Sequence, residues 1–549
     1  MDRRNLLKLT ALLAGAPTMT MLPARAAGQA ATAPPPATAL RWLDGAPPAS
    51  FTGATFGVPW PQGLVPRASG FTVLVAAGGV TPALQSWPLA YWPDGSVKWS
   101  GHAIGAGAPA SGYDLQPGPA TPAGAAMARR DGDDIVVDTG RLRARVPGKG
   151  GKVLAGVALA GHVLLGDGEL VLLTDTVNDG EEGTARRRRW HGEVARVELE
   201  QDGPVRTVVK ATGAHRVGDG ATLLPFTLRL EFHRDSDAIR VLHTFVIDVD
   251  PAKLDVRGIG LRFGLALDGA PHDRHVRFVS DGGGVFAESV RSLTGLRRDV
   301  GDANAAAQVA GRPLPPVEEL PQAVRDGLRY VPAFGDYRLV QPNADGFTIA
   351  KRTAKGHGWV PAAAGTRAGG TGYVGGAKGG VAFGVRNFWQ SHPGQLDITG
   401  AAGDDAAVTL WLWAPEAPPM QLRFYDDGMG QDTHARQRAA LDITYEDYEP
   451  GFGTPHGIAR TSELELQLLA ATPGAADLAA IGQRIAQPPR LMATPQRLHA
   501  AGVFSDYWAP AGQGARAQHR WRRGWRSCST TMKNRSSSGV GTVSGITAT

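Results

Sequence analysis

The sequence predicts a mainly β protein whose larger part is an antiparallel sandwich, followed by a helical segment. Apolar and polar residues alternate with a period of two almost everywhere up to about residue 415. The chain contains 73 glycines and 40 prolines, which indicate frequent turns between strands. Its 549 residues exceed the length at which a single core stops growing, roughly 250 to 300 residues. We therefore expect two or three domains.

The N-terminus predicts a twin-arginine signal peptide over residues 1–26. Arg3 and Arg4 precede an apolar run from Leu9 to Leu22, which ends at the small-residue site Ala24–Ala26. The run is too short and too rich in small residues to span a bilayer, which takes about 20 apolar residues. We expect export to the periplasm or the medium, with the Tat machinery as a partner and no stable membrane anchor. Residues 27–39 form a linker.

Three segments of the body predict antiparallel hairpins. Each has two alternating runs on either side of a turn sequence such as Gln-Asp-Gly-Pro. The segments are Ile135–Val146, Val194–Lys210 and Thr227–Val249. Val408–Trp413 predicts the last strand, so the central β-sandwich is assigned to residues 130–415.

After Pro415 the pattern changes toward helix. Leu464–Leu469 is compatible with a helix, and Thr472 in Thr-Pro-Gly is a candidate N-cap. Leu478, Ile481 and Ile485 then mark one helical face before Pro488. Residues 416–517 are predicted to begin a helical domain.

The end of the chain, residues 518–549, has an unusual composition. The last acidic residue is Asp506, and the segment is rich in arginine without a helical or strand period. One interpretation is a basic disordered tail. A second is a frameshift near residue 518, because a shifted reading frame permits an amphipathic helix over Gly524–Lys533. Sequencing the gene decides between the two.

Composition also limits the chemistry. The only cysteine is Cys528, so an intramolecular disulfide and a cysteine-based zinc site are excluded. The net charge of +6 favours an anionic partner, and nucleic acid is not expected for an exported protein. The acidic segments Asp131–Asp134 and Asp248–Asp250 lack the spacing of a calcium loop. We predict no cofactor and no metal, with calcium left open.

One short segment concentrates aromatic and basic residues. Trp87, Tyr91, Trp92 and Trp99 lie close in sequence to Lys98 and His102. Aromatic faces stack on sugar rings, which favours carbohydrate binding. The alternative interpretation is that these side chains fill a core. Pro93–Gly95 is a turn in either case.

Five segments resemble the exo-acting rhamnogalacturonan lyases of polysaccharide lyase family twenty-six, and the resemblance covers roughly residues 40 to 510. The segments are Phe56–Gly63, Gln85–His102, Gln341–Thr353, Arg386–Gln390 and Tyr445–Thr461. The resemblance implies a small N-terminal β-barrel over 40–125, a central β-sandwich and a C-terminal α/α toroid. It also implies a pectin substrate of alternating rhamnose and galacturonic acid. This chain departs from the family at its end, where most of the toroid is missing.

The implied reaction is β-elimination at galacturonic acid, which needs three groups. A cation neutralises the C6 carboxylate, a base removes the C5 proton, and an acid protonates the leaving oxygen. Lys98 or His102 is our candidate base. Candidates for holding the carboxylate or the sugar are Lys351, Arg352, Arg386, Trp389, His392 and His456. Each of these residues also fits a surface or strand-pairing role.

Two other kinds of function stay open. A glycoside hydrolase needs paired carboxylates, for which Asp426, Asp427, Glu446 and Glu449 are candidates. A non-catalytic glycan-binding remnant follows if the β domains fold without the toroid. Arg186–Arg189 fits either a grip on an acidic polymer or a solvated loop.

Overall fold

The computed structural model describes residues 37–76, 78–118, 124–177, 185–218, 220–251, 253–293, 299–420, 422, 436, 439, 455–505 and 508–510. The predicted signal peptide, the frameshift hypothesis and Cys528 therefore concern residues outside the described part. The linker predicted over residues 27–39 overlaps the first strand, which begins at Thr38. Within the described residues, no helix is long and apolar enough to cross a membrane.

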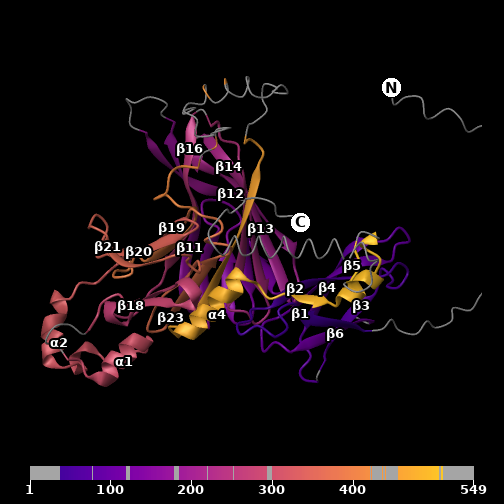
Figure 1. Cartoon of the computed structure of the whole chain (residues 1–549), viewed down its shortest axis with the longest axis horizontal. Coiled ribbons are helices and arrows are strands. Elements are labelled where there is room, and N and C mark those ends of the chain that lie inside the picture. Colours follow the sequence, from indigo (N-terminus) through magenta and orange to yellow (C-terminus); the bar gives the residue numbers. More distant parts are fainter. Residues whose placement is uncertain are drawn as a thin grey trace, which may run out of the picture.

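The N-terminal domain consists of two small antiparallel sheets (Figure 1). The first has four strands, in the order β27 (Leu491–Ala493), β1 (Thr38–Trp42), β6 (Gly112–Gly118) and β3 (Gly70–Val75). The second has three, in the order β2 (Ala54–Pro59), β5 (Val97–Ile104) and β4 (Leu84–Tyr91). Trp60, Leu40 and Val58 are fully buried in their common core. Strand β27 follows the sandwich in the sequence, so this sheet combines segments from both sides of the central domain.

The predicted turn at Pro93–Gly95 is confirmed. Gly95 has a φ of +85°, a conformation that glycine adopts without strain. The Asp94 carboxylate accepts hydrogen bonds from the backbone N–H of Ser96 at 2.9 Å and from its hydroxyl at 2.6 Å. These bonds lower the pKa of Asp94 and fix the connection between β4 and β5.

The central domain is a sandwich of two large antiparallel sheets. One sheet runs in the order β12 (Arg187–Gln201), β13 (Arg206–Val217), β14 (Ala221–His233), β15 (Ala238–Val246), β26 (Ala459–Leu469), β23 (Gly379–Val385), β22 (Thr371–Gly376), β17 (His275–Val279) and β18 (Val285–Ser289). The other runs in the order β11 (His162–Thr176), β16 (Leu254–Leu265), β25 (Ala407–Trp413), β24 (Gly394–Thr399), β19 (Asp336–Asn343), β20 (Gly346–Arg352) and β21 (Val360–Gly365). The sheets join where β11 also pairs with β12.

A meander extends the second sheet beyond β11. Its strands are β10 (Leu154–Leu159), β9 (Leu142–Val146), β8 (Asp134–Asp138) and β7 (Ala128–Asp131). All three predicted hairpins are confirmed, as β8–β9, β12–β13 and β14–β15. Their apolar residues face the shared core because side chains alternate along a strand.

The helix prediction for Leu464–Leu469 is wrong. This segment is strand β26, which pairs with β15 on one side and β23 on the other. Leu464 and Leu466 are buried, while Glu463 and Glu465, which alternate with them, are only partly buried, which is the period of a strand. A short run of Leu and Glu fits the period of a helix as well as that of a strand. Pairing with β15 and β23 makes this segment a strand. The β region therefore does not end at Trp413.

The predicted helix that follows is confirmed as α4 (Ala475–Ala486). Leu478, Ile481 and Ile485 are buried against β22 and β23. The N-cap is Gly474 and not Thr472, and it has no side-chain cap bond. The other helices in the described part of the chain are short: α1 (Asp302–Ala310), α2 (Gln322–Gly327), α5 (Pro495–Ala500), and single 3₁₀ turns at Pro271–Asp273, Asp281–Gly283, Val317–Glu319 and Leu328–Tyr330. The described helices are too few for a toroid.

Arg484 of α4 connects the two domains. Its guanidinium donates to the Ser50 hydroxyl at 3.0 Å and the Thr52 hydroxyl at 2.9 Å in the N-terminal domain. It also donates to the side-chain oxygen of Gln467 on β26 at 2.8 Å and forms an ion pair with Glu465. The side chain is 5% exposed, so these contacts are shielded from water.

Candidate functional site

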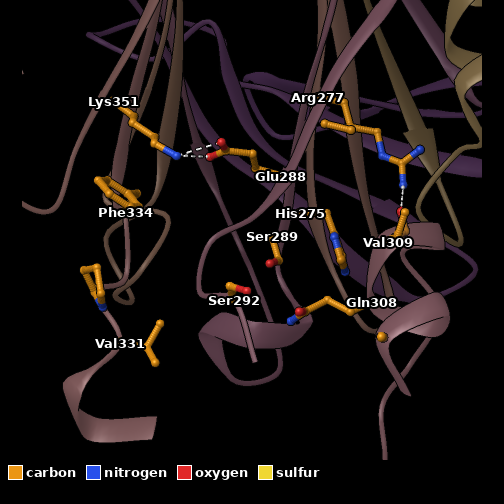
Figure 2. A pocket seen from close by; sticks show the side chains of 13 residues that line it. His275, Arg277, Glu288, Ser289, Ser292, Gln308, Val309, Val331, Phe334 and Lys351 are labelled. Carbon is orange, nitrogen blue, oxygen red and sulfur yellow. Dashed lines mark hydrogen bonds and ion pairs between the residues drawn. The ribbon is translucent and has the colours of Figure 1, made fainter. Parts of the chain in front are cut away.

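A cavity of about 440 Å³ lies near the edge of the sandwich, between β18, the outermost strand of one sheet, and β20, the strand next to the edge of the other (Figure 2). Strand β18 forms one side, β20 the other, and α1 and the segment before β19 cover it. The charged and polar side chains that line it are His275, Arg277, Glu288, Ser289, Ser292, Gln308 and Lys351. The volume falls in the range of small-ligand pockets, about 300 to 1,000 Å³.

An ion pair spans the cavity from one sheet to the other. The Nζ of Lys351 on β20 lies 2.6 Å from both carboxylate oxygens of Glu288 on β18. The same ammonium lies 4.3 Å from the ring centroid of Phe334, within the range of a cation–π contact. Figure 2 shows this pair beside the aromatic ring. Lys351 was predicted from sequence, and it is the predicted site residue that this cavity contains.

His275 supplies a neutral imidazole to the cavity. It begins β17 opposite Ser289 of β18 and is 3% exposed. Burial, and then the nearby charge of Arg277, lowers the pKa of His275 from its ordinary value of 6.5 to about 4. Its ring has no hydrogen-bond partner among the described residues. His275 is therefore unprotonated at neutral pH and free to accept a proton.

Arg277 and Gln308 hold the wall of the cavity in place. The guanidinium of Arg277 donates to the backbone oxygens of Pro473 at 2.6 Å and Val309 at 3.3 Å. The Gln308 side chain of α1 accepts from Leu293 N at 3.0 Å and donates to His272 O at 2.9 Å. These bonds tie α1 to the sheet edge, so the cavity is formed by a rigid frame.

Tyr337 lies behind the ion pair, on β19. It pairs in register with Lys351, and its side chain is fully buried. Burial, and then the negative charge of Glu288, raises the pKa of Tyr337, so the phenol stays protonated. The carboxylate of Glu288 thus faces a neutral phenol and a charged ammonium.

The predicted base His102 occupies a structural position instead. Its side chain is fully buried in the core of the N-terminal domain. Hydroxyls occupy both ring nitrogens: Ser86 lies 2.8 Å from Nδ1 and Ser100 lies 2.7 Å from Nε2. Burial lowers the pKa of His102 from 6.5 to about 3. A base must reach a substrate proton, and this ring has no open nitrogen, so we assign it a packing role.

The other predicted residues of the N-terminal domain form cation–π and stacking contacts. Lys98 lies 4.6 Å from the ring centroid of Trp92, and Arg67 lies 4.4 Å from that of Tyr91. Trp87 lies 5.6 Å from the guanidinium of Arg206 and lines a separate pocket of about 490 Å³. Trp99 meets Phe504 edge to face at 6.0 Å. None of these residues lines the cavity around Lys351.

The remaining predicted cations are distributed over separate places. Arg352 pairs with Asp336 at 2.7 Å, and Arg386 pairs with Glu463 at 2.9 Å. The Trp389 ring lies 4.4 Å from the guanidinium of Arg367, and His392 Nδ1 lies 3.2 Å from Trp389 O. His456 is exposed in a turn before β26. The structure therefore does not gather the predicted residues into one site.

Several acidic and basic clusters also have structural roles. Arg187–Arg189 belong to β12 and not to a loop, and Arg187 and Arg189 pair with Asp175 and Glu169 of β11. Arg145 pairs with Asp131 and Asp134. Within the described part of the chain, no group of three or more His, Cys, Asp or Glu side chains is arranged to hold a metal ion. The proposed carboxylates Asp426, Asp427, Glu446 and Glu449 lie outside it.

Sequence reasoning missed His275, Glu288 and Tyr337. One signal was present, because His275 and Arg277 are two ionisable residues two positions apart in an otherwise apolar strand. Such a spacing places both on one face of the sheet. Glu288 gave no comparable signal, since its partner is 63 residues away.

Two family models match the chain. The PcRGLX-like N-terminal RIFT barrel domain matches residues 36–118, and the PcRGLX-like protein central beta sandwich domain matches residues 126–483. The uncharacterized protein YetA of Bacillus subtilis (strain 168) is 31% identical over 476 residues, which cover 85% of this chain and 54% of that protein. The chain thus spans about half the length of this relative.

Solved structures show weaker likenesses. An alpha-mannosidase from Enterococcus faecalis V583 aligns at 10% identity with a TM-score of 0.41, covering 83% of this chain and 46% of that chain. A galactose mutarotase related enzyme from Lactobacillus acidophilus aligns at 10% identity with a TM-score of 0.26, covering 62% and 99%. These likenesses carry no argument about function.

Proposed function

This chain belongs to the PcRGLX-like family, whose RIFT barrel and central β-sandwich it contains, and from this membership we propose that it acts on rhamnogalacturonan by β-elimination. The two domains make it a carbohydrate-active enzyme-like protein. The proposed substrate unit is a galacturonic acid residue of the polymer. One observation carries the proposal: the Lys351 ammonium and the neutral imidazole of His275 line the same cavity.

Each part of the cavity corresponds to one need of the reaction. The Lys351 ammonium neutralises the C6 carboxylate by exchanging Glu288 for the substrate, which makes the C5 proton more acidic. His275 takes that proton because its ring is unprotonated and has no partner among the described residues. The C4–O bond then breaks, and the electron pair of the C5–H bond becomes the C4–C5 double bond. The imidazolium of His275 then returns its proton to the leaving oxygen, which departs as an alcohol.

The charge of the cavity favours elimination over two-carboxylate hydrolysis. Glu288 is the one carboxylate among the described residues that line it. Hydrolysis by the usual mechanism needs a second carboxylate across the scissile bond, about 5 to 10 Å away. The pocket instead supplies two cationic side chains and an imidazole, which suit a uronate.

A direct assay tests the proposal. Purified protein is incubated with rhamnogalacturonan backbone, and the absorbance of the unsaturated uronate product is followed. We expect turnover that falls about 100-fold or more in His275→Gln, because general-base catalysis contributes about 10² to 10⁴. Lys351→Met should fall by a similar factor. Lys355→Met, an exposed lysine just after β20, is the matched control and should keep full activity.

Three outcomes separate the candidate functions. Unsaturated product that depends on Lys351 and His275 supports the lyase. New reducing ends without that absorbance contradict it and favour a hydrolase. Saturable binding of the polymer without either product contradicts catalysis and identifies a glycan-binding protein.

We also propose that the protein acts after export through the twin-arginine pathway. The support is the order of Arg3, Arg4, the apolar run and Ala24–Ala26. Replacing both arginines with lysine should leave the precursor in the cytoplasm, as measured by fractionation and immunoblotting. Unchanged export of that variant contradicts the proposal.

A further inference from the structure

A second, smaller pocket of about 100 Å³ lies at one end of the sandwich, between the start of β26 and the loop that follows β23. The loop residues Arg386, Asn387 and Ser391 line one side, and Arg460, Thr461, Ser462 and Glu463 of β26 line the other, with Trp411 beside them. Asn387 has a φ of 55°, in the left-handed region, where the chain turns to wrap the pocket. This pocket shares no lining residue with the cavity around Lys351.

Arg460 has no carboxylate partner in this pocket. Its one side-chain hydrogen bond among the described residues runs from Nη2 to Ser391 O at 3.5 Å, the upper limit for such a bond. Burial lowers the pKa of Arg460, so its charge is poorly solvated as well as unpaired. A partly buried guanidinium with a single long bond has donors to spare for an anion.

Arg386 lies on the opposite face of β26 from Arg460, because its partner Glu463 alternates with Arg460 and Ser462 along the strand. Its Nη1 pairs with Glu463 at 2.9 Å, but Glu463 is shared with Arg240, also at 2.9 Å. The Nε of Arg386 is buried without a hydrogen-bond partner. The lining charges are two arginines and one glutamate, which leave one positive charge. Because Arg386 and Glu463 pair with each other, Arg460 carries the positive charge that remains uncompensated in this pocket.

We propose that this pocket binds a sugar-borne carboxylate, with the Arg460 guanidinium as its ligand. Arginine forms bidentate bonds to carboxylates, and the hydroxyl of Ser462 is available for a ring hydroxyl. The volume admits a carboxylate and its immediate carbons and not a whole sugar ring. The inference rests on the proposed function for its ligand class and adds a second uronate contact, away from the reacting one.

The test uses D-galacturonate as the probe and D-galactose as its uncharged counterpart, by calorimetric titration. Full-length Lys351→Met serves as the starting protein, so that the cavity around residue 351 has lost the ammonium proposed to bind the substrate carboxylate. Galacturonate should bind it and galactose should bind at least tenfold more weakly. Adding Arg460→Gln should weaken galacturonate at least tenfold, or about 1.4 kcal/mol. Adding Arg460→Lys should fall between, since lysine keeps the charge without the planar fork.

The matched control adds Arg196→Gln, which removes an exposed arginine on β12 that pairs with Glu198 at 2.7 Å, and should leave binding unchanged. Unchanged affinity in the Arg460→Gln protein overturns the inference, and so does equal binding of galactose. Absence of galacturonate binding to the starting protein overturns it too. None of these results touches the lyase proposal, which rests on unsaturated product formed by the wild-type chain. If Arg460→Gln does not fold, Arg460→Lys decides alone, because affinity equal to the starting protein contradicts a bidentate site.

Discussion

At the residue scale, burial decides what a titratable side chain does. His102 and His275 are both almost fully buried, yet hydroxyls occupy both ring nitrogens of the first, and the second has no hydrogen-bond partner among the described residues and faces a cavity. The sequence favoured His102 because aromatic residues surround it. The rings that pack against it are instead those of Phe56, stacked at 5.4 Å, and Phe71, edge to face at 4.8 Å.

His243 gives a residue-scale prediction about acid stability. It is fully buried on the inner face of β15, near Phe226 and His215, and neither ring nitrogen has a hydrogen-bond partner. Burial, followed by the charge of His215, lowers the pKa of His243 from 6.5 to about 3. Between about pH 6.5 and pH 3, His243 is protonated in the unfolded chain and stays neutral in the folded chain. Stability therefore falls as the pH drops, by up to about 1.4 kcal/mol per pH unit.

The replacement His243→Leu should remove this pH-dependent loss of stability, and it also removes the two ring nitrogens that lack hydrogen-bond partners. We expect the variant to be about 1 kcal/mol more stable at neutral pH, and to lose less stability on acidification than the wild type. Urea unfolding at neutral pH and at about pH 5 measures both quantities. The control is His162→Gln, at an exposed position on β11. Equal acid sensitivity of His243→Leu and the wild type contradicts the prediction.

At the element scale, β26 and α4 show how neighbours select a structure. The run Leu464–Leu469 becomes a strand because β15 and β23 offer backbone partners on both sides. Residues Ala475–Ala486 form a helix because their apolar side chains recur on one face, which covers β22 and β23. The two elements are adjacent in sequence and differ in the period of their leucines and isoleucines.

Leu478 gives the prediction at this scale. It is fully buried in the cluster formed with Tyr373, Ala382 and Val279. Leu478→Ala should lower the free energy of unfolding by about 2 to 5 kcal/mol, because a cavity replaces the side chain. The exposed Gln483→Ala in the same helix should change it by about 0.5 kcal/mol or less. Denaturant unfolding measures both. A loss in Leu478→Ala as small as in Gln483→Ala contradicts the packing described for α4.

At the scale of the whole molecule, segments that are far apart in the sequence form one domain. Strand β27 pairs with β1, with Leu40 opposite Ala493. The Gln85 side chain accepts from the backbone of Val205 at 3.0 Å and of Arg206 at 2.8 Å, so the N-terminal domain also docks on the β12–β13 turn. The two domains therefore share polar contacts as well as a chain connection.

Arg484→Met tests this docking. The change removes the bonds to Ser50 and Thr52 and leaves Glu465 without its cation, which costs about 3 to 5 kcal/mol for a buried pair. Hydrogen exchange in residues 50–55 should accelerate more than in the strands of the sandwich core. Arg325→Met, in the exposed part of α2, is the control. Uniform acceleration in both domains contradicts a local role for Arg484.

The sequence by itself determined the secondary structure wherever a pattern was long enough to have one period. The hairpins β8–β9, β12–β13 and β14–β15, the turn at Pro93–Gly95 and the helix α4 follow from alternation, turn residues and helical spacing, which are local properties. The RIFT barrel and the sandwich also followed from the quoted motifs, because a family resemblance carries its fold.

Only the tertiary structure decided which of these residues meet. Lys351 was named from sequence, but its partner Glu288 and its neighbour His275 lie on strands of the other sheet, and only the closing of the sandwich edge brings them together. Three cationic residues that were all candidate site residues lie in three different environments: Arg386, Arg352 and Lys98. Contacts between distant strands depend on sheet order and register, and a period of two leaves both undetermined.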